Sequence, residues 1–299
     1  MRCIQVRKQI VSSCPLCRSG HWTPVLEGED FDTGSGSYQI CCCAECGLKF
    51  TNPCPIAADL PLLYEDREFE SMPTSTPLSR LRAARLARRV RRLRPHFPQG
   101  QLACADLGTG DGFFATVVAN EPFCKRMLAV DLFEVPPPLL ARQGGFVEYA
   151  SFDRTYASSE KFDVVFARFV LEHVHDPHDF ARRVGALLNP GGALVIEVPN
   201  WNSRWRTMLG RYYSELSLPA HTLHFEPATL TRLLLDWHDV RIFEDQHGMV
   251  LGKSLGNWLG RPVQRTGPLT LALLPLELAV DLIGPPPNMT AIARKTASS

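Results

Sequence analysis

The sequence lacks three features that would assign a chain quickly: a long apolar run, an excess of one charge and an internal repeat. Its most apolar stretch, residues 269–283, is interrupted by a proline and two acids. A membrane-spanning helix needs about 20 mainly apolar residues, so we expect none. Lysine and arginine together number 32 against 31 acidic residues, so no overall field favours nucleic acid or an anionic membrane. The first residues contain no apolar run of signal-peptide length, so we expect a cytoplasmic protein.

Most of the composition is ordinary. Hydrophobic residues make up 45% of the 299 residues and charged residues 21%, which suffices for a buried core and predicts about two domains. Cysteine is the exception, because seven of the ten cysteines lie between Cys3 and Cys46. Thiols stay reduced in the cytoplasm, so paired cysteines favour a metal site over disulfides.

Two CxxC motifs stand 25 residues apart near the start of the chain. Four thiolates at this spacing complete a tetrahedral site, so we predict a structural Zn²⁺ in a zinc-ribbon-like module over residues 1–56. The predicted ligands are Cys14, Cys17, Cys43 and Cys46. Four reduced core cysteines and two disulfides are the alternatives. Cys41 or Cys42 would also serve in place of Cys43, but only Cys43 has the CxxC spacing to Cys46. Residues 28–37 are acidic and then rich in glycine and serine, which predicts a hairpin tip.

An arginine-rich segment follows a predicted linker over residues 57–78. Residues 79–94 have apolar positions at helical spacing and lie between Pro77 and Pro95, which predicts an amphipathic helix. Eight arginines are predicted on its other face. RNA binding is one explanation. A solvated helix face is the favoured one, because no aromatic residues are interleaved.

From residue 101 onward, strand-like segments alternate with helix-like segments. Strands are predicted over residues 102–107, 127–132, 146–150, 162–169, 193–198, 240–244 and 289–293. Helices are predicted over residues 113–120, 178–188 and 227–237. This alternation predicts an α/β, Rossmann-like, doubly wound seven-stranded sheet in a domain over residues 79–299. Its ligands are expected outside the carboxyl ends of the strands.

A glycine loop, residues 108–112, follows the first predicted strand. Dehydrogenases that bind dinucleotides also have such a loop, so the glycines alone do not select a ligand. Here the spacing is G-x-G-x-G, and Asp106 precedes the first glycine by two positions. A carboxylate there would repel a pyrophosphate and suits an ammonium group. Asp131, at the end of the second strand, can accept hydrogen bonds from both hydroxyls of a ribose. It therefore supports a nucleoside-containing ligand, whether that is a dinucleotide or a cofactor with an ammonium group.

Five segments in this order carry a family resemblance: ADLGTGDG, AVDL, FDVVFARFVLEHVHDP, NPGGALVIEVPN and HTLHFEPATL. They resemble class I S-adenosylmethionine-dependent methyltransferases. With CPLC and CAECGLKFTNP ahead of them, the chain resembles bacterial methyltransferases that carry an N-terminal zinc-binding segment, as some sugar C-methyltransferases do. The resemblance implies S-adenosylmethionine as cofactor and methyl transfer to an oxygen, nitrogen or carbon atom of a small-molecule acceptor. An RNA methyltransferase and a non-catalytic S-adenosylmethionine-binding protein are the alternatives, with nucleic acid disfavoured by the charge balance.

The resemblance also assigns roles to positions. It places the methionine part of the cofactor against residues 106–110, the ribose on Asp131 with Leu132 beside the adenine, and Asp153 near the adenine amino group. A surface turn is the alternative for Asp153. Arg168 ends the fourth strand and is a candidate to meet a carboxylate of the cofactor or the acceptor. The implied cofactor-binding residues are Asp106, Gly108, Thr109, Gly110, Asp131, Leu132, Asp153 and Arg168.

Three histidines are candidate general bases because they follow the fourth and fifth strands: His173, His221 and His224. A base with a pKa near neutrality is needed only if the acceptor is a hydroxyl or a carbon acid. The alternative is that these rings hold loops by hydrogen bonds, and their spacing gives no clear metal signal. His175 and His178 are expected in a solvated turn without a chemical role.

Two further features are expected to bear on the acceptor. The aromatic residues that follow the fifth strand are candidates to line its pocket, or else pack in the core: Trp201, Trp205, Tyr212 and Tyr213. Residues 248–287 are too long for a plain loop and predict a lid-like insertion. Glu277 and Asp281 lie on one face of this segment, which argues against a helix at a membrane surface, where a basic face is usual.

Overall fold

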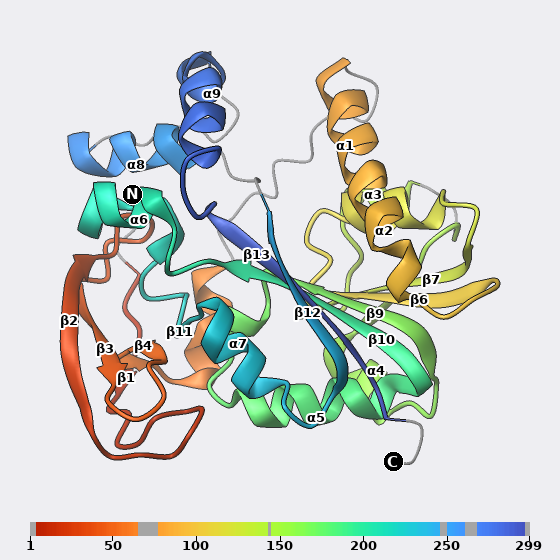
Figure 1. Ribbon diagram of the computed structural model, residues 1–299, viewed down its shortest axis with the longest axis horizontal. Coiled ribbons are helices and arrows are strands. Elements are labelled where there is room, and N and C mark those ends of the chain that lie inside the picture. Colours follow the sequence, from red (N-terminus) through yellow and green to blue (C-terminus); the bar gives the residue numbers. More distant parts are fainter. Residues whose placement is uncertain (1–3, 65–76, 143–144, 246–249, 261–267, 297–299) are drawn as a thin grey trace.

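Two sheets organise the chain (Figure 1). The computed structural model describes residues 4–64, 77–142, 145–245, 250–260 and 268–296. The larger sheet has seven strands in the order β12-β13-β10-β9-β6-β7-β8. Its strands are β6 (Leu102–Leu107), β7 (Cys124–Asp131), β8 (Glu148–Ser151), β9 (Phe162–Arg168), β10 (Leu188–Pro199), β12 (His238–Asp245) and β13 (Asn288–Arg294). β13 runs antiparallel to β10 and β12, and the other neighbouring strands are parallel. The prediction of a mostly parallel seven-stranded sheet is therefore confirmed.

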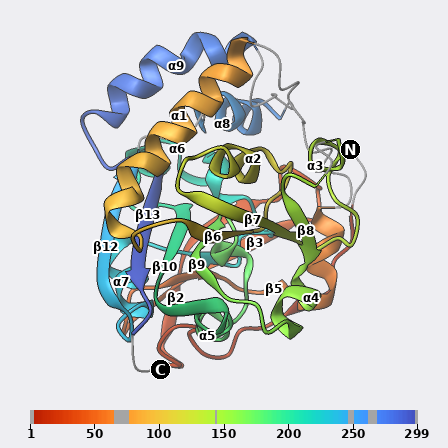
Figure 2. The same cartoon turned by 90° about the vertical axis from the view of Figure 1, so that its right-hand side faces the viewer.

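Helices cover both faces of this sheet (Figure 2). One face is covered by α1 (Pro77–Leu93), α2 (Phe113–Ala119) and α3 (Pro138–Ala141). The other is covered by α4 (Phe152–Ala157), α5 (Pro177–Leu187) and α7 (Pro227–Leu233). Successive strand residues point to opposite faces, so Val164 and Phe166 pack towards α1 and α2 while Val165 and Ala167 pack towards α5 and α7.

The N-terminal module shares its sheet with the C-terminal part of the chain. Its four strands, in the order β11-β4-β3-β2, are β2 (Trp22–Glu29), β3 (Ser37–Cys43), β4 (Lys49–Thr51) and β11 (Leu223–His224). A small pair, β1 (Lys8–Gln9) and β5 (Cys54–Pro55), adjoins it in sequence. The predicted hairpin tip lies between β2 and β3, where Asp30 accepts hydrogen bonds from the N–H groups of Asp32, Thr33 and Ser35. Because β11 pairs with β4, the module is joined to the larger domain by backbone hydrogen bonding.

Short helices connect these units. They are η1 (Ala57–Leu63), η2 (Arg94–His96), η3 (Leu171–His173), α6 (Arg204–Leu209), η4 (Gly210–Tyr212) and η5 (Ser214–Leu216). Two longer helices, α8 (Val250–Leu259) and α9 (Pro268–Asp281), occupy the described part of the predicted insertion. They share an apolar cluster with Tyr38 and Ile40 of the module. Among the described residues, no helix combines the length and the apolar character needed to span a bilayer.

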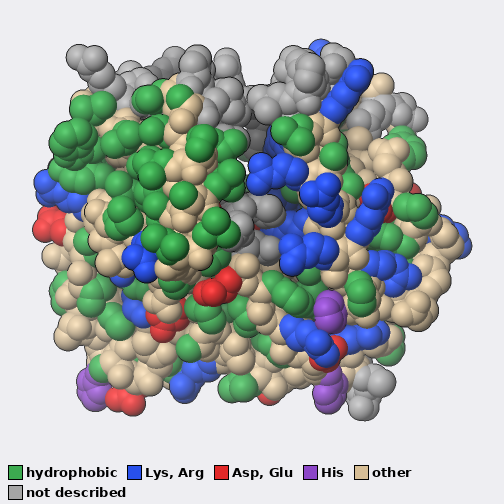
Figure 3. Space-filling model, turned by 45° about the horizontal axis from the view of Figure 1, so that its top comes forward, with side chains coloured by type: hydrophobic (Ala, Val, Ile, Leu, Met, Phe, Trp, Pro, Cys, Tyr) green, Lys and Arg blue, Asp and Glu red, His purple; other side chains and the backbone are tan. Residues whose placement is uncertain are grey.

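The face of α9 that meets solvent differs from the prediction. Glu277 and Asp281 are buried, with exposed fractions of 1% and 7%. Glu277 accepts a hydrogen bond from the N–H of Leu251, and Asp281 accepts one from Nε1 of Trp205 at 2.9 Å. The exposed side chains are instead apolar: Leu269, Leu276, Leu278, Leu282 and Ile283, together with Trp258 and Leu259 of α8. Figure 3 shows apolar side chains gathered over these helices, beside the arginines of α1. The acids face inward because the carboxylate of Glu277 accepts a hydrogen bond from an N–H in the first turn of α8, and that of Asp281 accepts one from the indole of Trp205.

One arginine of α1 is also buried, contrary to the prediction that all eight lie on the solvated face. Arg89 is 8% exposed, and its Nη1 donates to Oε1 of Glu197 at 2.6 Å. Its Nη2 donates to the hydroxyl of Thr290, while Nε of Arg168 donates to the second oxygen of Glu197 at 2.5 Å. Burial alone would raise the pKa of Glu197, but the guanidinium groups of Arg168 and Arg89 outweigh it and hold the pKa at about 2. This cluster joins α1 to β9, β10 and β13.

Replacing Arg89 by Met should lower the free energy of unfolding by about 3 kcal/mol, because a buried carboxylate loses one of its two partners. Arg182→Met is the matched control, since the Arg182 side chain is 70% exposed and pairs with Asp179 at the surface. That substitution should cost less than about 0.5 kcal/mol. Urea unfolding of both variants measures the difference; equal costs would mean that the buried cluster contributes no more than a surface pair.

Candidate functional site

The glycine loop lies where the strand order reverses. From β6 the chain continues to β7 and β8 on one side, and then to β9 and β10 on the other. The carboxyl ends of β6 and β9 therefore flank the position at which doubly wound sheets bind ligands. Residues 108–112 follow β6, and Phe169 follows β9. The predicted cofactor loop thus occupies this point.

Two glycines of the loop are required by close packing. Gly108 has φ +70°, and a Cβ there would lie 2.3 Å from Cγ2 of Val170. Gly112 has φ +76°, and its Cβ would lie 2.4 Å from Cγ of Leu140. A side chain at either position would be strained and would clash with Val170 or Leu140, so both positions require glycine.

Two carboxylates hold the loop. Asp106 is 2% exposed, and its Oδ2 accepts a hydrogen bond from the hydroxyl of Thr109 at 2.8 Å. Burial raises the pKa of Asp106 to about 7, although Arg168 and Thr109 oppose the shift. Asp131 accepts from the N–H of Gly110 at 2.7 Å and from that of Leu132 at 2.8 Å. Burial also raises the pKa of Asp131, against those two N–H groups. An ionised carboxylate has about four lone-pair sites, so both keep capacity for a ligand.

The remaining predicted cofactor residues lie at the same edge of the sheet. Leu132 follows β7 with half of its side chain exposed, and Asp153 is exposed in the first turn of α4, directly after β8. Arg168 does meet a carboxylate, but it is that of Glu197. The guanidinium also stacks 4.2 Å from the ring centroid of Phe114. The contacts of these side chains with a cofactor stay predictions.

The three candidate histidines come together. The ring centroids of His173 and His221 are 4.7 Å apart, and those of His221 and His224 are 6.4 Å apart. Nδ1 of His173 lies 2.9 Å from the carbonyl oxygen of Ala220, and Nδ1 of His221 lies 2.9 Å from that of Glu215. Both rings therefore hold neighbouring loops, which was the alternative to a chemical role, and they also face one another.

His224 departs from the predicted pKa. It is 7% exposed, its Nε2 lies 3.1 Å from the hydroxyl of Thr51, and burial lowers its pKa to about 3. At neutral pH the ring is uncharged and is a weak base, so the expectation of a near-neutral pKa is wrong for this histidine.

A buried glutamate that the sequence analysis did not single out lies beside these rings. Glu172 is 1% exposed, and its Oε1 is 3.9 Å from Nε2 of His221. Burial raises its pKa well above the usual value. The one available signal was its position next to His173 in the segment LEHV. The sequence contains nothing that links either residue to His221.

A small pocket adjoins His221 and His224. Its lining residues are Pro199, Asn200, Trp201, Arg206, Tyr213, Glu215, Leu216, His221, Leu223 and His224. Trp201 and Tyr213 thus line a cavity, as one of the two alternatives predicted. Trp205 is instead packed in the core, with 2% of its surface exposed.

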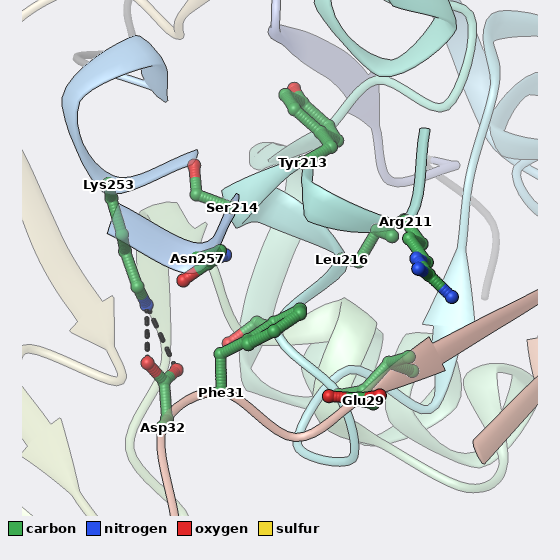
Figure 4. A pocket seen from close by; sticks show the side chains of 11 residues that line it. Glu29, Phe31, Asp32, Arg211, Tyr213, Ser214, Leu216, Lys253 and Asn257 are labelled. Atoms are coloured by element: carbon green, nitrogen blue, oxygen red, sulfur yellow. Dashed lines mark hydrogen bonds and ion pairs between the residues drawn. The ribbon is translucent and has the colours of Figure 1, made fainter. Parts of the chain in front are cut away.

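A second small pocket lies between the module and α8 (Figure 4). It shares Tyr213 and Leu216 with the first cavity. Across it, Nζ of Lys253 pairs with the carboxylate of Asp32 at 2.9 Å. This ion pair links α8 to the loop between β2 and β3.

The four predicted metal-binding cysteines also come together. One sulfur from each of Cys14, Cys17, Cys43 and Cys46 lies within 4.8 Å of the others, and all four thiols are free. The Sγ atoms of Cys14 and Cys46 are 3.5 Å apart, and those of Cys17 and Cys43 are 3.4 Å apart. Of the three adjacent cysteines, Cys43 takes part, which agrees with the predicted register. Gly47 turns the chain after the second motif with φ +76°.

The module is fixed to the histidine loops by side chains that the sequence analysis overlooked or set aside. The hydroxyl of Thr51 donates to the carbonyl oxygen of His221 at 2.7 Å, and that of Tyr64 lies 2.6 Å from Nδ1 of His173. Nε2 of His175 and of His178 lies 2.7 Å from the carbonyl oxygens of Pro55 and Leu16, respectively. Both histidines therefore contact the module, His175 from a half-buried position and His178 from an exposed one, as expected of a solvated turn.

Comparison with known proteins assigns the fold and the loop to a family. A family model described as a methyltransferase domain matches residues 78–258, more than half of the chain. The chain belongs to this methyltransferase family. The match includes the glycine loop, Asp131, Glu172 and the histidines, whereas the four cysteines lie outside it.

Two relatives of this methyltransferase are ubiquinone biosynthesis O-methyltransferases. That of Bradyrhizobium sp. (strain ORS 278) is 34% identical over 105 residues, covering 33% of this chain and 41% of the relative. That of Rhodopseudomonas palustris (strain BisB18) is 32% identical over 173 residues, covering 52% and 65%. The chain therefore spans less than two thirds of either relative. A solved structure, phosphoethanolamine N-methyltransferase 2 of Haemonchus contortus in complex with S-adenosyl-L-methionine, has a TM-score of 0.53 at 14% identity, covering 92% of this chain and 68% of that one. It supports the fold alone.

Proposed function

We propose that this methyltransferase transfers the methyl group of S-adenosylmethionine to an oxygen, nitrogen or carbon atom of a small-molecule acceptor, in the cytoplasm. The observation that carries the proposal is the pair Asp106 and Asp131, held around a glycine loop at the switch point of the sheet. The cofactor supplies an activated methyl group on a sulfonium. Family membership and the names of the relatives, which are O-methyltransferases, support the proposal.

The residues present fit this cofactor. Asp106 is placed to pair with the ammonium of its methionine part, and Asp131 to accept hydrogen bonds from its ribose hydroxyls. Gly108 and Gly112 allow the left-handed turns of the loop between these carboxylates, with Val170 and Leu140 packed against them. Leu132 and Asp153 then border the adenine, at the ends of β7 and β8.

The protein's contribution to methyl transfer is mainly alignment of the acceptor with the methyl carbon and the sulfur. We assign the acceptor to the cavity beside His221, because its wall follows the carboxyl end of β10 and includes the candidate bases. If the acceptor is a hydroxyl or a carbon acid, His221 is the ring placed to take its proton. His224 is a poor candidate because its pKa is about 3.

We further propose that the four cysteines hold a structural Zn²⁺. A Zn–S bond of about 2.3 Å in tetrahedral geometry puts sulfurs about 3.8 Å apart. The sulfur–sulfur distances of 3.4 and 3.5 Å are close to that value. Four thiolates leave no open position, so the ion would hold the module together and take no part in the transfer.

Calorimetry with S-adenosylmethionine tests the cofactor assignment. The wild-type chain should bind it, and Asp131→Ala should weaken binding at least about tenfold, because hydrogen bonds to a charged group contribute roughly 1.5–3 kcal/mol each. Asp179→Ala, in the exposed first turn of α5, should leave binding unchanged. The assignment fails if the wild type does not bind or if Asp131→Ala binds equally well. Transfer of a labelled methyl group to a panel of small-molecule acceptors then tests the reaction.

Binding should also depend on pH through Asp106. With a pKa of about 7, this carboxyl becomes ionised as pH rises, so affinity for the cationic cofactor should increase by up to about tenfold between pH 6 and pH 8. Stability without ligand should change in the opposite direction. In the unfolded chain the carboxyl ionises near its usual pKa of 3.8, whereas in the folded chain it ionises near 7. The contribution of Asp106 to the free energy of unfolding therefore declines as pH rises from about 3.8 to about 7.

Asp106→Asn should bind the cofactor more weakly and remove both trends. The charged or titratable groups near this carboxyl are Arg168, Asp131 and Asp111, and all three remain in the variant. Calorimetry between pH 6 and pH 8 measures the binding trend, and urea unfolding between about pH 4 and pH 7 measures the stability trend. An unchanged pH profile in Asp106→Asn would assign the dependence to another group.

Metal analysis tests the zinc proposal. Cys46→Ser should lose one zinc ion per chain, whereas Cys42→Ser should retain it, because Cys42 lies outside the four-sulfur cluster. Losing the ion should release β4 and so the loop of His221, which Thr51 holds. Cys46→Ser should therefore lose methyl transfer while keeping its affinity for the cofactor. If the variant loses about 3 kcal/mol of its free energy of unfolding, its melting temperature should fall by about 6–12 °C. Equal zinc content in both variants would rule out the assigned ligands.

A further inference from the structure

Three side chains form a second group of possible metal ligands, distinct from the cysteines. Glu172 and His173 belong to η3, after β9, and His221 precedes β11. One candidate ligand atom from each lies within 4.8 Å of the others, although 47 residues separate His173 from His221 in the sequence. The pairing of β11 with β4 and the docking of the module bring the two segments together.

Glu172 is the unusual member of this group. It is 1% exposed, and within the described part of the chain neither of its side-chain oxygens has a hydrogen-bond partner. Burying a polar group without a hydrogen bond is costly, and burying a charge without a partner is more so. Its oxygens point towards the imidazole of His221, at 3.9 Å, which is beyond hydrogen-bond distance. A cation between these groups would compensate the buried carboxylate.

The two imidazoles are oriented as metal ligands usually are. Nδ1 of each ring lies 2.9 Å from a backbone carbonyl oxygen, that of Ala220 for His173 and that of Glu215 for His221. A carbonyl can only accept, so Nδ1 of His221 carries the hydrogen and its Nε2 presents a lone pair. Nδ1 of His173 also lies 2.6 Å from the hydroxyl of Tyr64, which can donate or accept. In most protein metal sites a histidine ligand donates its second N–H to such a group, which fixes the tautomer and the direction of the ring.

We propose that Glu172, His173 and His221 bind one divalent transition-metal ion through a carboxylate oxygen and two imidazole nitrogens. This donor set suits ions such as Zn²⁺ and Mn²⁺, and differs from the all-sulfur set of the cysteine module. Three protein ligands leave a coordination position open. His221 borders the pocket that it shares with His224, so a water or an oxygen of the acceptor can complete the coordination.

Only the last step, coordination of the acceptor, rests on the proposed function. Binding of the ion itself does not need S-adenosylmethionine or turnover. With the ion bound, His221 acts as a ligand, and the cation lowers the pKa of a coordinated hydroxyl. Without it, His221 is the base proposed above. Metal dependence of methyl transfer therefore distinguishes the two roles.

Titration with Mn²⁺ of the full chain loaded with one Zn²⁺ per chain tests the site, because the four thiolates hold that zinc and Mn²⁺, which prefers oxygen and nitrogen ligands, does not replace it there. Calorimetry should detect one Mn²⁺ per chain, and the melting temperature should rise with Mn²⁺ concentration. Glu172→Gln, which keeps the shape and removes the charge, should weaken binding by more than about tenfold, since even changes behind a metal ligand cost 10- to 100-fold. His221→Asn should weaken binding comparably.

Glu215→Gln is the matched control, because it removes a neighbouring acid whose carboxylate is outside the group; it should change the affinity by less than about fivefold. Melting curves without added metal verify that each variant folds. If the wild type binds no Mn²⁺ beyond its zinc, or if Glu172→Gln binds it as tightly as the wild type, the site does not exist. Cofactor binding measured on the same samples shows separately whether the proposed function holds.

Discussion

The proposed acceptor site of this methyltransferase depends on one backbone pairing, that of β11 with β4. Two residues, Leu223 and His224, form the edge strand of the module's sheet, and Thr51 reinforces the pairing from its side chain. The module is too small to bury much apolar surface alone, so its strands need an additional constraint, which four thiolates on one ion would supply. A change at the cysteines is thus transmitted to the histidines through backbone hydrogen bonds, with no side-chain contact between the two groups required.

The cofactor side is built differently and does not need the module. The loop after β6 is held by Asp106 and Asp131, which belong to neighbouring strands of the large sheet. Beneath it, Glu197 lies between two guanidinium groups and fixes α1 against β9 and β10. A carboxylate with a pKa of about 2 stays ionised over the whole working range, so this support does not change when Asp106 titrates near pH 7. The cofactor site and the acceptor site can therefore be perturbed separately.

The sequence predicted the sheet well because its strands are short apolar runs between glycine-rich turns, and β6 begins and ends where it was expected. The cysteine cluster was predictable for a similar reason: each CxxC pair is local. The orientation of helices was less accessible. In α9 the acidic face is inside, and in α1 Arg89 is inside, because each charged group meets a particular partner far along the chain. Periodicity places residues on a face, but only tertiary contacts decide which face is buried.

The same limit explains why the sequence contains no metal signal for the histidines. Glu172 and His173 are adjacent and His221 is distant, so no spacing rule connects them; the fold alone does. An unpartnered carboxylate is nevertheless a physical cost that a folded chain seldom carries without a ligand or a proton. A proton would leave Glu172 neutral and without a role, whereas a cation would use all three side chains and the carbonyl-bound imidazoles at once. Because Nδ1 of His221 is on the carbonyl oxygen of Glu215, Nε2 of that ring is left on the side of Glu172, where a cation would join the two.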